Sequence, residues 1–497
     1  MLKNIENILS NKLFFILSIL VLIFITRVGF WNLIIIDGSD EITYLLSGRE
    51  ILNNKLPYRD FWEIKPPIAF LPYILANLFS NEIFAIRVIG FFTLVLTSCL
   101  LFFQISKITN IFLGKIFTII FILLNTNSFF QSSGLTLFIY PLLISISYFL
   151  IEKKKSNNNY FLIGLLVSFI CLIRPNFYPL VIGILLINYL INKNNLKNIF
   201  LYIFGGVTPL IVIIIFYSTF DNGLNILKNF LFNLLAAGSY NNFFWNLREV
   251  SRYLLDGVDG IIFLTTILLI LFNFKNFVKE KINVIFLILF ISCFISVLIV
   301  FTGNYQFNNF YLYLIILASL TLKNINIQNK IKFKILILTI SSIIPFLLSS
   351  SISIVKNNNI FFESNNKLLS YDKTKLDKNE MIINYLKKII NKSDKIYAYD
   401  NFFYLKLKKE LMSNIIHPTN FYRLHIYKNI PGVEKNTELE YLKILEKRPD
   451  WLIIRKEIFD NEKYFSKNFK EIVMTKWNLY DILKGNDDHY LFKISNN

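Results

Sequence analysis

An acidic loop follows the first long apolar run of the sequence. Between Ile34 and Phe70 it carries six carboxylates and then a lysine in front of two prolines, Lys65-Pro66-Pro67. Carboxylates beside a membrane are costly unless they meet water, a partner or a substrate. The loop is therefore either a solvated connector or a site that uses acidic groups and a cation together. The six carboxylates are Asp37, Asp40, Glu41, Glu50, Asp60 and Glu63.

Asp40 and Glu41 lie only a few residues beyond the first long apolar run. If residues 39–52 form a helix with Ser39 as its N-cap, Asp40 and Tyr44 share one face. Glu41 then points about 100° away. A partly desolvated carboxylate has a raised pKa and becomes a usable base. A carboxylate of this pair could therefore serve as a general base, and Tyr44, on the same face as Asp40, is included among the substrate-binding candidates.

Lys65 has the surroundings of a phosphate-binding cation. Proline is favoured in the first turn of a helix, so Pro66-Pro67 predict a helix over residues 66–79. That segment is too short to span a bilayer and apolar enough to lie in its interface. An ammonium group at that height meets a phosphate as a point charge, and Arg59 could assist it. A base and a cation in one loop suggest group transfer from a lipid phosphate.

The elements that must hold this loop are membrane helices. Of the 497 residues, 54% are hydrophobic, and they come in runs of about 17–24 residues, enough to cross a ~30 Å hydrocarbon core. We predict a polytopic α-helical membrane protein with about eleven spans. The expected spans are 13–36, 83–106, 111–126, 134–151, 160–173, 175–191, 198–219, 258–274, 282–301, 308–322 and 333–355.

The charges predict the orientation of these spans. The net charge is +19, and its lysines collect in alternate loops, as in cytoplasmic loops. We therefore expect no nucleic-acid partner, a plasma (inner) membrane location, a cytoplasmic N-terminus and an extracytoplasmic C-terminus. Arg174-Pro175 interrupts residues 160–191, which we interpret as two helices. A single kinked helix is the alternative, and it would invert the downstream topology.

The C-terminal part of the chain reads as a separate domain. We predict a membrane domain over residues 1–355, including the loop 37–82, and a small extracytoplasmic α/β domain over 356–497. About 140 residues suffice for an independent core. Helices are expected at 379–390 and 437–446 and strands at 395–399 and 451–455, with "EIVMTKW", "LYDILK" and "HYLFKI" as closing strands.

The order of residues in the first loop resembles the GT-C glycosyltransferases, which include protein O-mannosyltransferases and lipid A aminoarabinose transferases. The resemblance rests on "DE" at Asp40-Glu41, then on "GREILNNKLPYRDFWEIKPP" and the interfacial helix after it. It is specific over about the first 110 residues. The rest agrees only in layout, and the bacterial family 39 type looks most similar.

The resemblance implies an inverting transfer of one sugar from a polyprenyl-phosphate donor. The acceptor would be a hydroxyl of a lipopolysaccharide, another glycolipid or a protein, on the extracytoplasmic face. Asp40 matches the catalytic carboxylate of the family, and Glu41 matches its neighbour. Lys65 matches the lysine that meets the donor phosphate, while Arg59 and Asp60 match a frequent dipeptide that we assign to phosphate and substrate contact.

The sequence departs from the family at one place. Many members carry a second acidic residue after "GLTL"-like residues, whereas "SSGLTLFIYPLL" has none and Tyr140 or a neighbour takes that place. We therefore expect no obligatory metal and no cofactor besides the lipid-linked donor. The alternatives are an envelope-glycan flippase or polymerase and a non-catalytic partner. A flippase should carry charges inside its helices, where this chain has few.

Two further residues have open assignments. Arg174 is either an interfacial anchor or a second phosphate contact. His417 and His425 are eight residues apart in "HPTNFYRLHIY", which is not the spacing of a helical metal pair. His417 is either structural or a contact to acceptor or lid, and we include it among the substrate-binding candidates. The cysteines Cys99, Cys171 and Cys293 all lie in apolar runs, which favours buried thiols.

Overall fold

A computed structural model describes most of the chain. Its helices and strands form two compact units. One unit takes its described residues from Met1–Phe30, Arg87–Ile213 and Gly238–Phe362, and the other from Trp31–Ile86, Ile214–Ala237 and Glu363–Asn497. The described residues are 12–27, 40–125, 134–152, 157–192, 196–238, 243–256, 258–300, 304–323, 373–421, 424, 427, 430, 432–462, 464–484 and 488–495.

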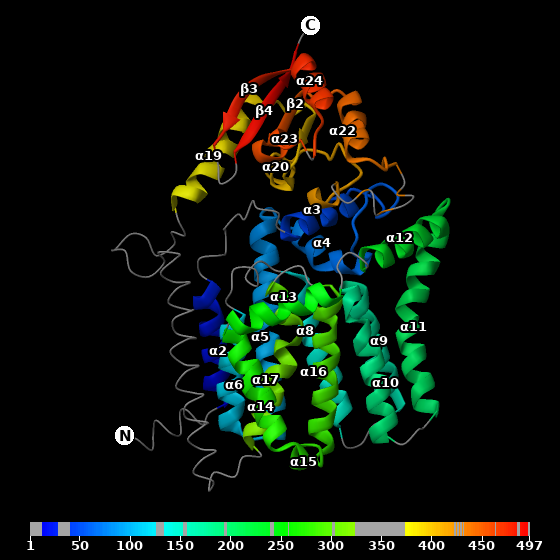
Figure 1. The fold of residues 1–497 in the computed structure, drawn as a ribbon, viewed down its shortest axis with the longest axis vertical. Coiled ribbons are helices and arrows are strands. Elements are labelled where there is room, and N and C mark those ends of the chain that lie inside the picture. Colours follow the sequence, from blue (N-terminus) through cyan, green and yellow to red (C-terminus); the bar gives the residue numbers. More distant parts are fainter. Residues whose placement is uncertain are drawn as a thin grey trace. The chain divides into compact units, whose positions relative to one another are not determined.

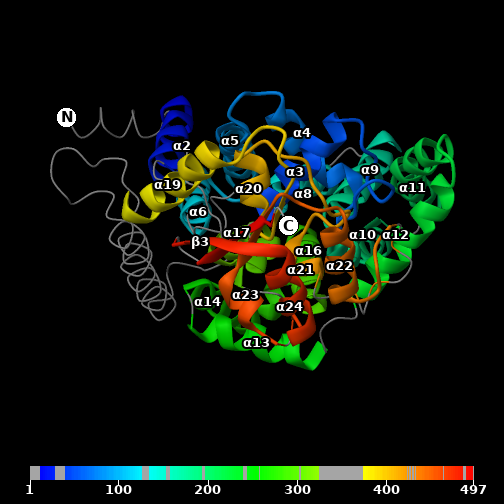
Figure 2. The ribbon, with the colours of Figure 1, turned by 90° about the horizontal axis from the view of Figure 1, so that it is seen from above.

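The described residues of the first unit form helices joined by short non-helical segments. Helix α16 packs against α10 and α17 (Figure 2), and these helices bury apolar side chains on several faces, as expected where neighbours surround a helix. Three helices in the described chain are long and apolar enough to cross a membrane, namely α5, α11 and α16. The helices are α2(Lys12–Arg27), α5(Glu82–Ile108), α6(Ile111–Leu124), α8(Leu135–Ile151), α9(Asn157–Ile173), α10(Tyr178–Asn192), α11(Leu196–Ser218), α13(Phe243–Asp256), α14(Val258–Phe272), α15(Phe274–Phe277), α16(Lys281–Ile299) and α17(Asn308–Lys323), with 3-10 turns η3(Pro175–Phe177) and η4(Asn304–Phe307).

Helices occupy the expected spans wherever the structure describes them. The span predicted at 333–355 lies outside the described residues, and the span at 13–36 is described only as far as Arg27. The break at Arg174-Pro175 is present, because Arg174 is extended (φ −137°, ψ 97°) and Pro175 opens η3. The prediction of two helices, α9 and α10, is therefore correct, and the number of membrane crossings stays a prediction.

The second unit joins the first loop to the C-terminal residues. Its loop portion holds α3(Asp40–Leu52), η2(Pro67–Phe70) and α4(Leu71–Asn77), and α12(Gly223–Gly238) adds a further helix. The predicted start at the prolines is confirmed, since Pro66 is extended and Pro67 opens η2. Helix α4 and the two residues after it expose four large apolar side chains, as expected of a segment that lies in a membrane interface. These are Leu71, Leu75, Leu78 and Phe79.

The C-terminal part of this unit is built around a mixed four-stranded sheet (Figure 1). The strand order is β1-β2-β4-β3, with β1 parallel to β2 and the remaining pairs antiparallel. The strands are β1(Ile396–Ala398), β2(Trp451–Arg455), β3(Trp477–Leu483) and β4(His489–Ile494), and the helices are α19(Lys373–Ile389), α20(Asn401–Lys406), α21(Pro418–Phe421), α22(Thr437–Glu446), α23(Lys456–Asp460) and α24(Lys467–Lys476).

One predicted strand is wrong. Most of "EIVMTKW" belongs to α24 and only its tryptophan, Trp477, begins β3. The helix has a good start, because the side chain of Ser466 accepts a hydrogen bond from the Phe469 amide. Phe469 and Val473 are both buried and lie one turn apart. Helical spacing across residues 466–476 therefore outweighs the strand propensity of the short apolar run.

Candidate functional site

Helix α3 carries the predicted base in its first turn. Asp40 and Glu41 lie where a helix N-terminus favours negative charge. The Asp40 side chain is 49% exposed, whereas Glu41 is buried. Tyr44 is also buried, with its ring 5.3 Å from that of Tyr73 and 6.1 Å from that of Phe70. Of the residues predicted on this helix, the structure presents Asp40 to solvent and packs Tyr44 into the core.

Helices α3 and α4 approach each other closely at Gly48, which sets the direction of α3 relative to α4. A Cβ atom at Gly48 would lie 2.8 Å from the Tyr73 carbonyl carbon and 2.9 Å from the Ile74 amide nitrogen. These are backbone atoms, so no side-chain movement could relieve the contact. Asn77 adds a hydrogen bond of 2.8 Å from Nδ2 to the Leu45 carbonyl. The close backbone approach of α4 therefore requires glycine at position 48 of α3.

The residues after α3 form a tight loop centred on Tyr58. Tyr58 has a left-handed backbone (φ 68°), and its amide donates to the Phe61 carbonyl at 2.6 Å. Its ring is buried and stacks on Phe230 with a centroid distance of 4.0 Å. Its hydroxyl donates to the Lys65 carbonyl at 2.5 Å. Tyr58 therefore anchors the backbone of Lys65 to α12.

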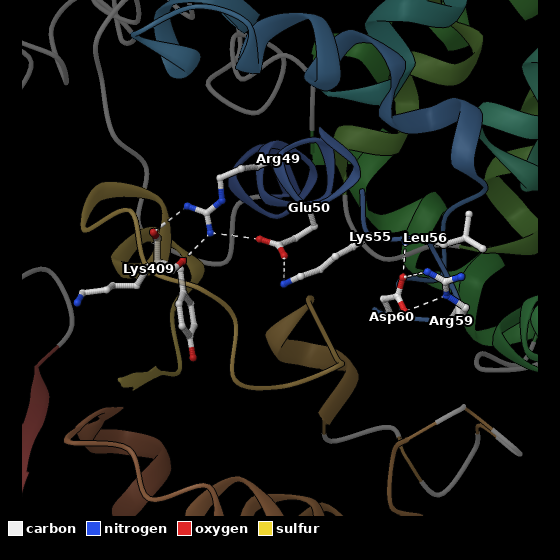
Figure 3. A network of polar contacts seen from close by, with 8 residues as sticks. Arg49, Glu50, Lys55, Leu56, Arg59, Asp60 and Lys409 are labelled. Carbon is white, nitrogen blue, oxygen red and sulfur yellow. Dashed lines mark hydrogen bonds and ion pairs between the residues drawn. The ribbon is translucent and has the colours of Figure 1, made fainter. Parts of the chain in front are cut away.

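Arg59 and Asp60 are engaged with each other (Figure 3). The guanidinium donates from Nε to Oδ1 at 2.9 Å and from Nη2 to Oδ2 at 2.7 Å, and Oδ2 also accepts from the Leu56 amide at 2.7 Å. Partial burial raises the pKa of Asp60, but the bonds from Arg59 and Leu56 outweigh it and lower the pKa overall. In this arrangement the pair stabilises the turn between Leu56 and Asp60. Contacts of Arg59 with the donor phosphate and of Asp60 with substrate stay predictions.

A parallel β-bridge brings the C-terminal residues to the loop. The Trp62 amide donates to the Asn414 carbonyl at 2.6 Å, and the Ile416 amide donates to the Trp62 carbonyl at 3.2 Å. The two segments run in the same direction. Glu63 is the residue after Trp62 on one segment, and His417 comes two residues after Ile415 on the other. This is how His417 reaches the first loop.

His417 is hydrogen-bonded to the predicted base. Its Nε2 lies 3.1 Å from Asp40 Oδ1. Its Nδ1 lies 3.3 Å from the Thr419 amide, which donates to it, and 2.8 Å from the Thr419 hydroxyl. His417 itself is only 12% exposed. The structure thus joins two residues that the sequence analysis placed in the same site for separate reasons.

The charges around His417 are predominantly negative. Burial lowers the pKa of His417, but the hydrogen bond to Asp40 and the charge of Glu63 outweigh it, so the pKa is raised. Burial raises the pKa of Glu63, and the positive charges of His417 and Lys65 offset this only in part. Neither Glu63 oxygen receives a hydrogen bond from another side chain in the described residues. Lys65 is half-buried and supplies the cation of the group.

Two polar ties hold α3 to the C-terminal residues. Arg49 donates to the Tyr404 carbonyl at 3.1 Å and to the Lys409 carbonyl at 2.7 Å (Figure 3). Asn401 donates to the Thr43 hydroxyl at 2.9 Å and to the Ile416 carbonyl at 2.9 Å. Both views of the ribbon place α20 beside α3 (Figures 1 and 2). The helix that bears Asp40 is therefore fixed to the segment that bears His417.

Arg174 lies in the other unit. It is buried, and its guanidinium donates to Thr136 and, at 3.0 Å, to Asn309 Oδ1. Tyr140 donates to the Asn308 carbonyl at 3.1 Å. These residues form a buried polar cluster within the helices. Whether Arg174 contacts a phosphate stays a prediction.

The sequence analysis missed Glu63 and Thr419 as members of the site. Glu63 was visible as one of six loop carboxylates, but nothing in its spacing separated it from the others. Thr419 follows His417 by two residues, and only the fold shows its contact with the ring. Within the described residues no group of three or more His, Cys, Asp or Glu could hold a metal ion.

Comparison with solved structures shows that the chain shares its fold with ArnT, a protein of known crystal structure. One match is the crystal structure of ArnT from Cupriavidus metallidurans in the apo state, at 10% identity and TM-score 0.59, covering 97% of this chain and 97% of that chain. Another is the same protein bound to undecaprenyl phosphate, at 10% identity and TM-score 0.60, covering 97% and 98%. The predicted resemblance is confirmed at the level of the fold.

An oligosaccharyltransferase from Archaeoglobus fulgidus matches at 11% identity and TM-score 0.48, covering 96% of this chain and 72% of that chain. No protein-family model matches the chain, and no curated protein matches it.

Proposed function

We propose that the protein is an inverting glycosyltransferase of the plasma membrane. It moves one sugar from a polyprenyl-phosphate donor to a hydroxyl of an envelope glycan, glycolipid or protein on the extracytoplasmic face. The fold shared with ArnT supports this, and so does the undecaprenyl phosphate bound in one ArnT structure. The donor is a substrate, and the reaction calls on no separate cofactor.

The observation that carries the proposal is the pairing of Asp40 with His417 in the unit that also holds Lys65. Asp40 is half-exposed and hydrogen-bonded by a histidine, so the ring orients a carboxylate that solvent and an acceptor can reach. Lys65 contributes positive charge to the same group. A base and a cation are the two components that transfer from a phosphate requires.

The reaction is a single displacement at the anomeric carbon of the sugar. Asp40 accepts the proton of the acceptor hydroxyl as that oxygen forms its bond to the carbon. The bond from the carbon to the phosphate oxygen breaks on the opposite side, and polyprenyl phosphate leaves with the electron pair. Lys65 stabilises the charge that develops on this phosphate. A single displacement inverts the configuration of the sugar.

The test is a mass-spectrometric profile of envelope glycans and lipid-linked sugars in three strains: wild type, deletion and Asp40→Asn at equal protein level. We expect the deletion and the variant to lose the same sugar from one envelope glycan and to accumulate the matching polyprenyl-phosphate sugar. If the deletion has this effect but Asp40→Asn resembles wild type, Asp40 is not the base. Loss of whole glycan chains from the surface, with the sugar already attached, would instead indicate a flippase.

A further inference from the structure

We infer that His417 is the positioning residue of the Asp40 base, held in its donating form by Thr419 and kept beside a second, buried carboxylate, Glu63. This inference rests on the proposed function. It assigns a task to the C-terminal residues, which would complete a site that the first loop begins. It also places a second acid in a chain that lacks one near Tyr140.

The contacts of the imidazole ring fix its neutral tautomer. A backbone N–H can only donate, so Nδ1 of His417 must accept the bond from the Thr419 amide. The ring proton of the neutral form is then on Nε2. That nitrogen lies 3.1 Å from Asp40 Oδ1 and donates to it. The base is thus held by one oxygen in the orientation that α3 and the ring together set.

Glu63 completes the arrangement through its charge. It is 1% exposed, and the β-bridge between Trp62 and Ile415 holds it next to His417. A buried carboxylate without a hydrogen-bonding side chain is costly and is found mainly where its charge is used. Its charge faces the ring together with those of Asp40 and Lys65. A negative neighbour favours the protonated form of an imidazole, so the charge of Glu63 keeps a proton on the ring beside Asp40.

The chain is well suited to a direct measurement, because it has only three histidines, His417, His425 and His489. Full-length protein labelled with ¹⁵N-histidine is titrated by NMR, and the signals are assigned with His425→Asn and His489→Asn. We expect His417 to be protonated at Nε2 in its neutral form, with a pKa above its ordinary 6.5. Asp40→Asn and Glu63→Gln should each lower that pKa, whereas Glu457→Gln, at an exposed position in the same unit, should not change it.

The second arm measures transfer with two isosteric variants. The amide of His417→Gln can reach the place of Nε2 and still donate to Asp40, whereas that of His417→Asn lies nearer to Nδ1. We expect His417→Asn to lower turnover about 100-fold, as for a reacting group misplaced by about 1 Å, with little change in the donor KM. His417→Gln should retain more turnover at equal protein level.

Three results would overturn the inference. The first is a His417 pKa that neither Asp40→Asn nor Glu63→Gln changes, and the second is a neutral ring protonated at Nδ1. The third is equal turnover in wild type and His417→Asn. The titration needs no substrate, so a chain that proves not to be a glycosyltransferase would fail the glycan profile while its histidine titration is still measured. Failure of this inference and failure of the proposed function are therefore distinguishable.

Discussion

A buried ionic cluster at the edge of the C-terminal sheet gives the most quantitative prediction. Asp400 follows β1 and accepts hydrogen bonds from Arg455 Nη2 at 2.8 Å, from Arg455 Nε at 3.3 Å and from His489 Nε2 at 2.6 Å. Its side chain is only 3% exposed. Replacing it with asparagine removes the charge that compensates Arg455 and turns an amide N–H₂ toward its donors.

The magnitude follows from burial. Removing one partner of a buried ion pair costs about 3–5 kcal/mol. The lower figure applies here, because the Arg455 side chain is 13% exposed and keeps some access to water. For a unit of this size each kcal/mol lowers the unfolding temperature by about 2–4 °C. Asp400→Asn should therefore lower the transition of this unit by about 6–12 °C.

The assay is intrinsic tryptophan fluorescence of the full-length protein during heating in detergent. Trp451 and Trp477 are buried in the affected sheet and report its unfolding. The matched control is Asp460→Asn in the same unit, because Asp460 is exposed and accepts one bond of 3.2 Å from Tyr490. We expect the control to stay within about 0.5 kcal/mol of wild type.

A compensating variant separates the ion pair from simple packing. In Asp400→Leu combined with Arg455→Met, both charges are replaced by apolar groups, and this should recover part of the lost stability. If Asp400→Asn melts with the control, the cluster does not stabilise the sheet and the assignment of the buried pair is wrong.

Three further predictions concern the loop. Gly48→Ala should disrupt the crossing of α3 and α4, because its Cβ would lie 2.8 Å from backbone, and limited proteolysis should cleave the loop faster than in wild type. Tyr58→Phe removes the bond to the Lys65 carbonyl, worth about 0.5–1.5 kcal/mol; native mass spectrometry should show weaker binding of undecaprenyl phosphate, and unchanged binding would contradict a phosphate role for Lys65. Burial raises the pKa of Glu63 from 4.5, so its contribution to stability is present below pH 4.5 and is lost as the pH rises through the raised value. As the pH rises over this range, the unfolding temperature of Glu63→Gln should increase relative to that of wild type. If the two plots of unfolding temperature against pH stay parallel, Glu63 does not titrate there.

Local patterns in the sequence predicted most of the helices. Apolar runs gave the spans, Arg174-Pro175 gave the break between α9 and α10, and Pro66-Pro67 gave the start of η2. These features depend on residues within a turn or two of one another. The error at "EIVMTKW" also came from local pattern, because a short apolar run fits a strand as well as a helix. The N-cap at Ser466 was the signal that could have corrected it.

The composition of the site was only partly predictable. Asp40 and Lys65 were recognisable from their order in the loop. The contact of Asp40 with His417 joins residues 377 positions apart, and the bridge between Trp62 and Ile415 that produces it has no local signature. The burial of Glu63 is a property of the folded unit, so one loop carboxylate among six could not be singled out by spacing.

The most direct test of the central claim is single-turnover transfer by purified Asp40→Asn. The donor is the lipid-linked sugar pool extracted from the deletion strain, and the acceptor is envelope extract from that strain. Asp460→Asn serves as the matched control. We expect Asp40→Asn to bind the donor as wild type does and to transfer it about 10²–10⁴-fold more slowly, the usual contribution of a positioned base. Transfer at the wild-type rate with the donor bound would contradict the assignment of Asp40 as the base.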